Sequence, residues 1–216
     1  MSHYAAAIFD LDGTLIDTER PVIDSGLAVL DAMGHDLDRG FLLGLIGIDA
    51  PEGARRLTAR LGPAFDFAAF DAAWRVAADA AFAAGIPPMP GVEALLGELE
   101  RRGMPRAVAT NSATGSARRK LRAAGLAARF AEAHVVGFDV VARPKPAADV
   151  YLEAAARLGV PPAACVAFED SDPGVAAALA AGMTVVHVPD MAPARRRDAH
   201  HLADSILDGA RACGLI

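Results

Sequence analysis

The chain has 216 residues, of which 53% are hydrophobic and 22% are charged, and its formal net charge is −6 at pH 7. This length and balance are typical of a globular protein with a core of its own, and they exclude a disordered chain. The negative charge argues against a nucleic-acid partner, because phosphate backbones select basic surfaces. The short basic run Arg195 to Arg197 is interpreted as a solvated loop.

Cysteine usage and the N-terminal segment both predict a cytoplasmic protein. Cys165 and Cys213 lie far apart, and neither belongs to a spacing typical of a disulfide framework or a zinc site. Residues 1–7 lack the basic region and the apolar stretch of a signal peptide. No window approaches the roughly 18 apolar residues that a membrane-spanning helix needs. We therefore expect a reducing compartment and no membrane partner.

The first predicted element is a buried strand. Residues 4–9 (YAAAIF) are short and continuously apolar, which suits a strand covered on both faces. From about residue 18 the pattern becomes helical, with apolar residues three and four positions apart in segments 21–34, 52–62 and 65–85. The segment 85–91 (GIPPMPG) is rich in proline and glycine and predicts a hinge that closes this helical section.

After the hinge, helices alternate with strands. The predicted helices are 92–103, 113–126, 147–159 and 173–182, and the predicted strands are 105–110, 134–137, 165–170 and 184–189. Such alternation builds a parallel sheet with helices on both faces. The expected fold is α/β, a doubly wound parallel sheet formed by residues 1–17 and 86–216. An all-helical insertion, residues 18–85, interrupts this core after its first strand.

Polar side chains stand at the ends of three predicted strands. They are Asp10 and Asp12, Thr110 to Ser112, and Glu169 and Asp170. Ligands of an open parallel sheet bind beyond the carboxyl ends of its strands, so these side chains are expected to converge. Lys145 precedes a predicted helix in an extended loop, between Pro144 and Pro146, and is expected at the same edge.

Clustered carboxylates without histidine or cysteine favour a hard divalent cation, and Mg2+ fits best. A lysine and a hydroxyl beside such a cation are usual neighbours of a phosphate. Asp10 can then attack phosphorus and form an aspartyl phosphate, because the cation and Lys145 offset the repulsion between two anions. Asp12 would protonate the leaving oxygen and later activate a water molecule.

Four segments in this order resemble the motifs of the haloacid dehalogenase superfamily. They are DLDGTLIDTE (10–19), ATNS (109–112), RPKPAADVY (143–151) and FEDSDPGVAAALAAGM (168–183). The resemblance is closer to the branch of phosphatases and β-phosphoglucomutase, whose members carry a small helical cap. It spans residues 6–188, which is nearly the whole chain.

This resemblance implies catalytic and phosphate-binding roles for five residues. Asp10 would be the nucleophile, and Asp12 the general acid and base. Thr110 and the backbone of Asn111 would bind the transferring phosphoryl group. Lys145 would neutralise that group and orient Asp10.

The resemblance also implies the metal ligands and the role of the helical insertion. Asp10, Glu169 and Asp170 would bind Mg2+ through their side chains, and Asp12 through its backbone carbonyl. Residues 18–85 would form a cap domain that closes over the substrate.

Two groups of residues in the insertion receive structural interpretations. Phe67, Phe70 and Trp74 recur at helical spacing, which favours core packing. Arg56 and Arg60 share one helix face, and a solvated face is the favoured interpretation. Contact of these arginines with a second anionic group of the substrate remains open.

Other acids and histidines are assigned no chemistry. Asp172 directly precedes Pro173 and Gly174 and is interpreted as a helix N-cap. The segment 10–21 is not a calcium loop of the EF-hand type, because its glycine and its final residue stand at the wrong positions. The histidines that fit no metal spacing are His134, His187, His200 and His201.

The predicted function is hydrolysis of a small phosphorylated metabolite by a Mg2+-dependent phosphatase. The alternative is a sugar phosphomutase, which would share the aspartyl phosphate but return the phosphoryl group to a sugar. Resemblance to the mutases would call for a cap-loop arginine and a histidine five residues after Asp17. Here those places hold residues 47–50 (GIDA) and Val22, so hydrolysis is favoured.

Two remoter alternatives are a non-catalytic member of the family and a receiver-like phospho-binding domain. A receiver carries its acids, threonine and lysine in a different chain order and has no helical insertion. A non-catalytic member is disfavoured because every catalytic position of the family is occupied in this chain. A monomer is expected, with a dimer as the alternative. The sequence does not identify the substrate.

Overall fold

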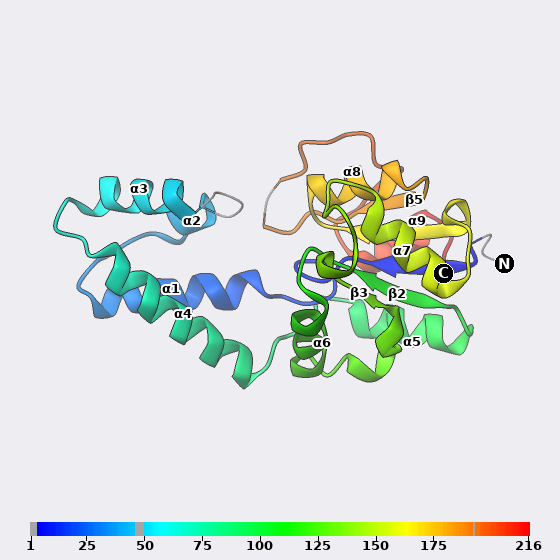
Figure 1. Ribbon diagram of the computed structural model, residues 1–216, viewed down its shortest axis with the longest axis horizontal. Coiled ribbons are helices and arrows are strands. Elements are labelled where there is room, and N and C mark those ends of the chain that lie inside the picture. The colour runs from blue at the N-terminus through cyan, green and yellow to red at the C-terminus, as the bar shows by residue number, and fades with distance from the viewer. Residues whose placement is uncertain (1–3, 46–49, 192) are drawn as a thin grey trace. The chain divides into compact units, whose positions relative to one another are not determined.

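The computed structural model describes residues 4–45, 50–191 and 193–216. The chain divides into two compact units, one formed by Met1–Asp17 with Pro87–Ile216 and the other by Thr18–Ile86. Among the described residues, all strands belong to the first unit, and the regular elements of the second are helices (Figure 1). The second boundary lies one residue later than the sequence pattern indicates.

The first unit contains a six-stranded sheet in the order β3-β2-β1-β4-β5-β6, and every neighbouring pair is parallel. The strands are β1 (Ala6–Phe9), β2 (Arg106–Ala109), β3 (Val135–Val136), β4 (Cys165–Glu169), β5 (Thr184–His187) and β6 (His201–Leu202). The chain runs outward from β1 through β2 to β3 and returns beside β1 as β4. This reversal of direction confirms the doubly wound α/β fold and places the switch point between β1 and β4.

Five helices accompany this sheet: α5 (Val92–Arg101), α6 (Thr114–Ala123), α7 (Asp149–Leu158), α8 (Asp172–Ala180) and α9 (Ile206–Ala212). Because strand side chains alternate, successive residues face opposite layers. Ile8 of β1 shares a buried cluster with Val150 of α7 and Val175 of α8. On the other face, Phe9 stacks on Phe168 at 5.0 Å between ring centroids. Helices α7 and α8 therefore cover one face of the sheet.

The C-terminal elements β6 and α9 were not predicted from the sequence, because two and seven residues are too short to set a period. Four short 3₁₀ helices were not predicted either: Ala127–Arg129, Glu132–His134, Phe138–Val140 and Pro162–Ala164. Helix α9 packs on the sheet, since a Cβ at Gly209 would lie 2.3 Å from the Val186 side chain.

The interpretation of Asp172 as an N-cap is wrong. Helix α8 is capped by Ser171, whose Oγ accepts a hydrogen bond from the Gly174 amide at 3.3 Å. Asp172 stands inside the first turn, and its carboxylate accepts bonds from the backbone amides of Arg195 and Arg196. Both Ser and Asp are good caps, and Pro173 lies in the first turn with either of them, so the local sequence left the choice to tertiary contacts.

The second unit consists of α1 (Glu19–Ala32), α2 (Arg39–Leu43), α3 (Ala50–Leu61) and α4 (Phe67–Ala84). Trp74 joins α4 to α1, because its Nε1 donates to the Val22 carbonyl at 2.7 Å. A Cβ at Gly26 would lie 2.9 Å from the Trp74 ring, so only glycine permits this approach. Phe70 is fully buried. Its ring centroid lies 5.1 Å from that of Trp74 and 6.3 Å from that of Phe67, which confirms the core-packing prediction.

Arg56 and Arg60 lie on an exposed face of α3, as the solvated interpretation predicts. Arg56 donates to Glu52 at 2.7 Å, one turn earlier on the same helix. Such exposed pairs contribute little to stability. Across the described ranges, no helix combines the length and apolar character that a bilayer crossing requires.

Candidate active site

Two aspartates follow β1 at the switch point of the sheet. Asp10 continues the strand, because its amide donates to the Phe168 carbonyl of β4 at 2.9 Å, and its side chain is buried. Gly13 then turns the chain with φ of +83°, a conformation that favours glycine. A Cβ at Gly13 would lie 2.4 Å from the Asp170 carboxylate, so this turn brings the two loops together.

Lys145 forms a buried bridge between two carboxylates. Its Nζ lies 2.5 Å from Asp10 Oδ1 and 2.5 Å from Glu169 Oε1. Burial raises the pKa of Asp10 to about 8, although the Lys145 charge opposes that rise. Burial by itself would lower the pKa of Lys145, but the attraction of Asp10 and Glu169 outweighs it and raises that pKa. Lys145 is therefore held as an ammonium ion beside Asp10.

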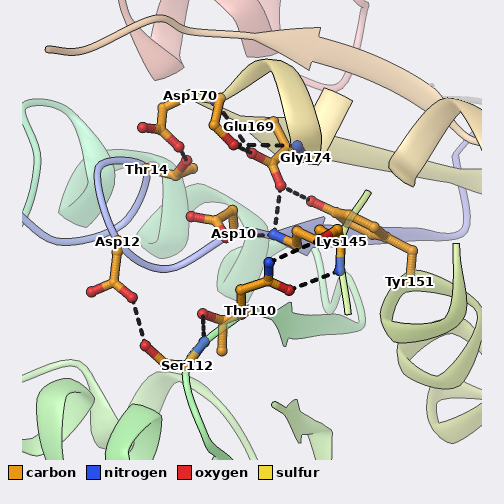
Figure 2. Close-up of polar contacts among 12 residues, drawn as sticks. Asp10, Asp12, Thr14, Thr110, Ser112, Lys145, Tyr151, Glu169, Asp170 and Gly174 are labelled. Carbon is orange, nitrogen blue, oxygen red and sulfur yellow. Dashed lines mark hydrogen bonds and ion pairs between the residues drawn. The ribbon is translucent and has the colours of Figure 1, made fainter. Parts of the chain in front are cut away.

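Glu169 is fully buried and accepts hydrogen bonds on both carboxylate oxygens. Besides Lys145, Tyr151 Oη donates to Oε1 at 2.6 Å, and Ser171 Oγ donates to Oε2 at 3.0 Å. A Cβ at Gly174 would lie 1.9 Å from this carboxylate, so α8 packs directly against it (Figure 2). These contacts fix the orientation of Glu169.

Asp10, Glu169 and Asp170 each offer a carboxylate oxygen, and these oxygens all lie within 4.8 Å of one another. Asp170 is half-buried, and its Oδ1 lies 3.4 Å from the Thr14 hydroxyl. Three carboxyl groups gather around the single Lys145 ammonium, and ionising all three in this buried place is costly without a further cation. The all-oxygen donor set fits Mg2+, because hard cations prefer such ligands.

Asp12 points to a different set of partners. Ser112 Oγ donates to Asp12 Oδ2 at 2.9 Å, and Lys120 Nζ donates to Asp12 Oδ1 at 2.7 Å. Lys120 also donates to Ser112 Oγ at 3.0 Å. Sequence reasoning did not single out Lys120, because it stands in a basic run of the predicted helix beside Arg118, Arg119 and Arg122.

Thr110 and Asn111 follow β2 at the same edge. Thr110 is buried, and its Oγ1 accepts a bond from the Ser112 amide at 3.0 Å. The Asn111 side chain accepts from the Lys145 amide at 2.8 Å and donates to the Lys145 carbonyl at 3.2 Å. Asn111 therefore ties the Lys145 loop to β2, a positioning contact that sequence reasoning, which used only its backbone, did not foresee.

Tyr151 and His187 are further residues of the site that sequence reasoning missed. Tyr151 lies within the RPKPAADVY segment, but its spacing on α7 is that of an ordinary core residue. His187 is buried, and its Nε2 lies 3.0 Å from the Asp170 carbonyl oxygen. The β4–β5 pairing sets His187 opposite Glu169, a relation that only the sheet order reveals.

Comparisons with known proteins agree with this geometry. The family described as haloacid dehalogenase-like hydrolase matches residues 4–182. Fructose-1-phosphate phosphatase YqaB of Escherichia coli (strain K12) is 35% identical over 185 residues, which cover 86% of this chain and 96% of that protein. Hexitol phosphatase A of the same organism is 36% identical over 182 residues, which cover 84% and 81% of the two chains.

A solved structure extends the similarity to the whole chain. The HAD family hydrolase from Deinococcus radiodurans R1, solved with bound phosphate and sodium, has a TM-score of 0.88 and 30% identity, and the match covers 100% of this chain and 99% of that one. The motifs, the sheet order and these matches agree with one another. The chain belongs to the haloacid dehalogenase-like hydrolases, an enzyme family that includes the two phosphatases named above.

Proposed function

We propose that this enzyme is a Mg2+-dependent phosphatase that hydrolyses the phosphate monoester of a small metabolite through an aspartyl phosphate. The observation that carries the proposal is the buried Asp10 carboxylate, 2.5 Å from the Lys145 ammonium and within the cluster of Asp10, Glu169 and Asp170. This arrangement joins a nucleophile, a fixed positive charge and a place for a divalent cation. The phosphatase relatives support the same reaction class.

In the first step, a carboxylate oxygen of Asp10 attacks phosphorus, and the bond from phosphorus to the leaving oxygen breaks. Lys145 neutralises charge on the phosphoryl oxygens, and Thr110 with the backbone of Asn111 binds them. Mg2+, held by side chains of the acidic cluster and by the Asp12 carbonyl, would reduce the repulsion between the two anions. Lys145 thus acts on both partners of the attack.

Asp12 is proposed to move the protons of both steps. It protonates the leaving oxygen as the aspartyl phosphate forms, and its carboxylate then takes a proton from the attacking water. Water attack on phosphorus releases phosphate and restores the Asp10 carboxylate. The helical unit, Thr18–Ile86, is proposed to act as the cap that the sequence indicates at residues 18–85 and to exclude bulk solvent during these steps.

A sugar phosphomutase is the second candidate, because it would use the same aspartyl phosphate. The mutases call for an arginine in the segment 47–50, of which residues 47–49 lie outside the described residues. The absence of that arginine is therefore argued from the sequence alone. Val22 belongs to α1, and its side chain has no group that could hold a second phosphate. A bisphosphate intermediate would therefore dissociate, and water would accept the phosphoryl group.

The test of this proposal is phosphate release from a panel of phosphorylated metabolites with Mg2+ present. The panel includes fructose 1-phosphate and hexitol phosphates, because relatives are named for related substrates. Glucose 1-phosphate, with a catalytic amount of glucose 1,6-bisphosphate, is expected to give no glucose 6-phosphate. Isomerisation faster than phosphate release would assign the chain to the mutases instead.

Replacement of Lys145 by alanine is expected to cost at least about 3 kcal/mol of transition-state stabilisation, which is more than about 100-fold in kcat/KM. The phosphoryl charge would then face Asp10 without its counter-charge. Arginine in its place is expected to restore little, because a planar guanidinium cannot occupy the position of a compact ammonium. Steady-state kinetics check both variants, and a wild-type rate in either would remove Lys145 from the reaction.

We also propose that the enzyme acts in the cytoplasm, as a monomer with a dimer as the alternative, and binds neither nucleic acid nor membranes. Cys165 and Cys213 support a reducing compartment, because both are buried free thiols. Light scattering of the purified chain measures its oligomeric state.

A further inference from the structure

Lysine is rare in this chain, and both lysines contact aspartates of the segment that follows β1. Lysine and arginine together number 21, but Lys120 and Lys145 are the only lysines. Lys145 Nζ lies 2.5 Å from Asp10, and Lys120 Nζ lies 2.7 Å from Asp12. Apart from the histidines, all other basic side chains of the chain are arginines, whose guanidinium is a planar fork of donors rather than a compact ammonium. A compact ammonium is therefore used where the proposed nucleophile and proton donor stand.

Lys120, Ser112 and Asp12 form a closed ring of hydrogen bonds. Lys120 donates to Asp12 Oδ1 at 2.7 Å and to Ser112 Oγ at 3.0 Å, while Ser112 donates to Asp12 Oδ2 at 2.9 Å. The three residues come from α6, from the loop after β2 and from the loop after β1, and the Ser112 contact is visible in Figure 2. Each oxygen of Asp12 thus has its own donor, and together these donors fix the rotation of the carboxylate.

An ordinary surface ion pair does not account for this arrangement. Exposed pairs usually leave both side chains in water and contribute about 0–1 kcal/mol. The side chains of Lys120 and Asp12 are only 21% and 28% exposed. The partner of Lys120 is also the proposed acid and base, whose work requires a carboxylate held within hydrogen-bond reach of the reacting oxygen.

We infer that Lys120 is a positioning residue, which together with Ser112 holds the Asp12 carboxylate in the orientation for proton transfer. The inference rests on the proposed phosphatase function, and it adds to that function a residue of α6 that acts through Asp12. Lys120 contacts the side chain of Asp12, whereas the proposed metal contact of Asp12 is its backbone carbonyl.

Replacement of Lys120 by methionine keeps a chain of similar length and removes the ammonium. We expect kcat to fall about tenfold or more, but by less than the full 10²–10⁴-fold that general acid–base catalysis contributes. Lys120→Arg is expected to restore little of the rate, because the planar fork cannot reproduce the ring. Arg119→Met, an exposed neighbour on α6, is the matched control and is expected to keep the wild-type rate.

A double-mutant cycle distinguishes positioning from a merely structural role. If Lys120 acts through Asp12, Lys120→Met has little further effect in an Asp12→Asn background. The phosphorylated enzyme is also expected to accumulate in Lys120→Met, as in Asp12→Asn, which acid quenching and mass spectrometry detect. Circular dichroism and the melting temperature report whether each variant remains folded.

Two results would overturn the inference: a wild-type kcat in Lys120→Met, or equal losses in the wild-type and Asp12→Asn backgrounds. These differ from a failure of the proposed function, in which the wild-type enzyme itself would release no phosphate and form no phosphoenzyme.

Discussion

Replacement of Asp10 by asparagine is expected to eliminate phosphate release, with a loss of about 10⁴-fold or more. The amide keeps the size of the side chain but is not a nucleophile toward phosphorus. The fold is expected to persist for two reasons. The substitution removes one charge from a cluster of three carboxylates, which reduces their mutual repulsion, and Lys145 keeps its contact with Glu169. Phosphate release and acid-quench trapping of the phosphoenzyme measure the effect.

Two further variants make the Asp10 result specific. Asp12→Asn is expected to slow phosphate release without eliminating formation of the phosphoenzyme, because Asp12 moves protons and Asp10 accepts the phosphoryl group. Asp204→Asn, an exposed acid outside the site, is expected to match the wild type. A phosphoenzyme formed by Asp10→Asn would show that another residue is the acceptor.

Replacement of Asp170 by alanine is expected to abolish turnover by weakening Mg2+ binding. Removal of a residue that only hydrogen-bonds to a metal ligand lowers metal affinity or activity by roughly 10- to 100-fold. Removal of Asp170, a proposed ligand itself, should lower activity by more than that. Asp170 is half-buried at the carboxyl end of β4, so its truncation leaves the buried strand intact. Calorimetric titration of the metal-free chain with Mg2+ alone measures the affinity, and circular dichroism checks the fold.

Asp172→Ala is the matched control for Asp170. Its carboxylate lies in the same DSD segment but accepts from the amides of Arg195 and Arg196, outside the acidic cluster. The Mg2+ affinity of the Asp172→Ala variant is expected to equal that of the wild type. In the wild type, excess chelator should stop phosphate release, and Mg2+ should restore it. Turnover that persists in chelator would contradict a metal-dependent reaction.

Much of the fold follows from local patterns in the sequence. The apolar run before Asp10 is β1, and the alternation after residue 91 matches the order of α5 to β5 in the structure. These predictions depend on the side-chain period of one element at a time, which a short window of sequence contains. The parallel sheet then follows from the alternation, because helical connections join parallel strands.

The C-terminal elements and the cap of α8 could not be predicted in the same way. Strand β6 spans two residues, and its existence depends on pairing with β5. Ser171, rather than Asp172, caps α8 because the Asp172 carboxylate meets amides of a segment more than 20 residues later. When local preferences are nearly equal, distant partners decide between them.

The sequence by itself determined which chemical groups stand at the ends of β1, β2 and β4, because a strand and the residues that follow it are contiguous in the chain. It thereby determined the candidate nucleophile, the candidate acid and base, and the acidic pair Glu169 and Asp170. The tertiary structure alone decided which side chains these groups contact. Lys120 reaches Asp12 across 108 positions, and Tyr151 reaches Glu169 from α7. Such contacts depend on how helices cross the sheet edge, and no local period records that geometry.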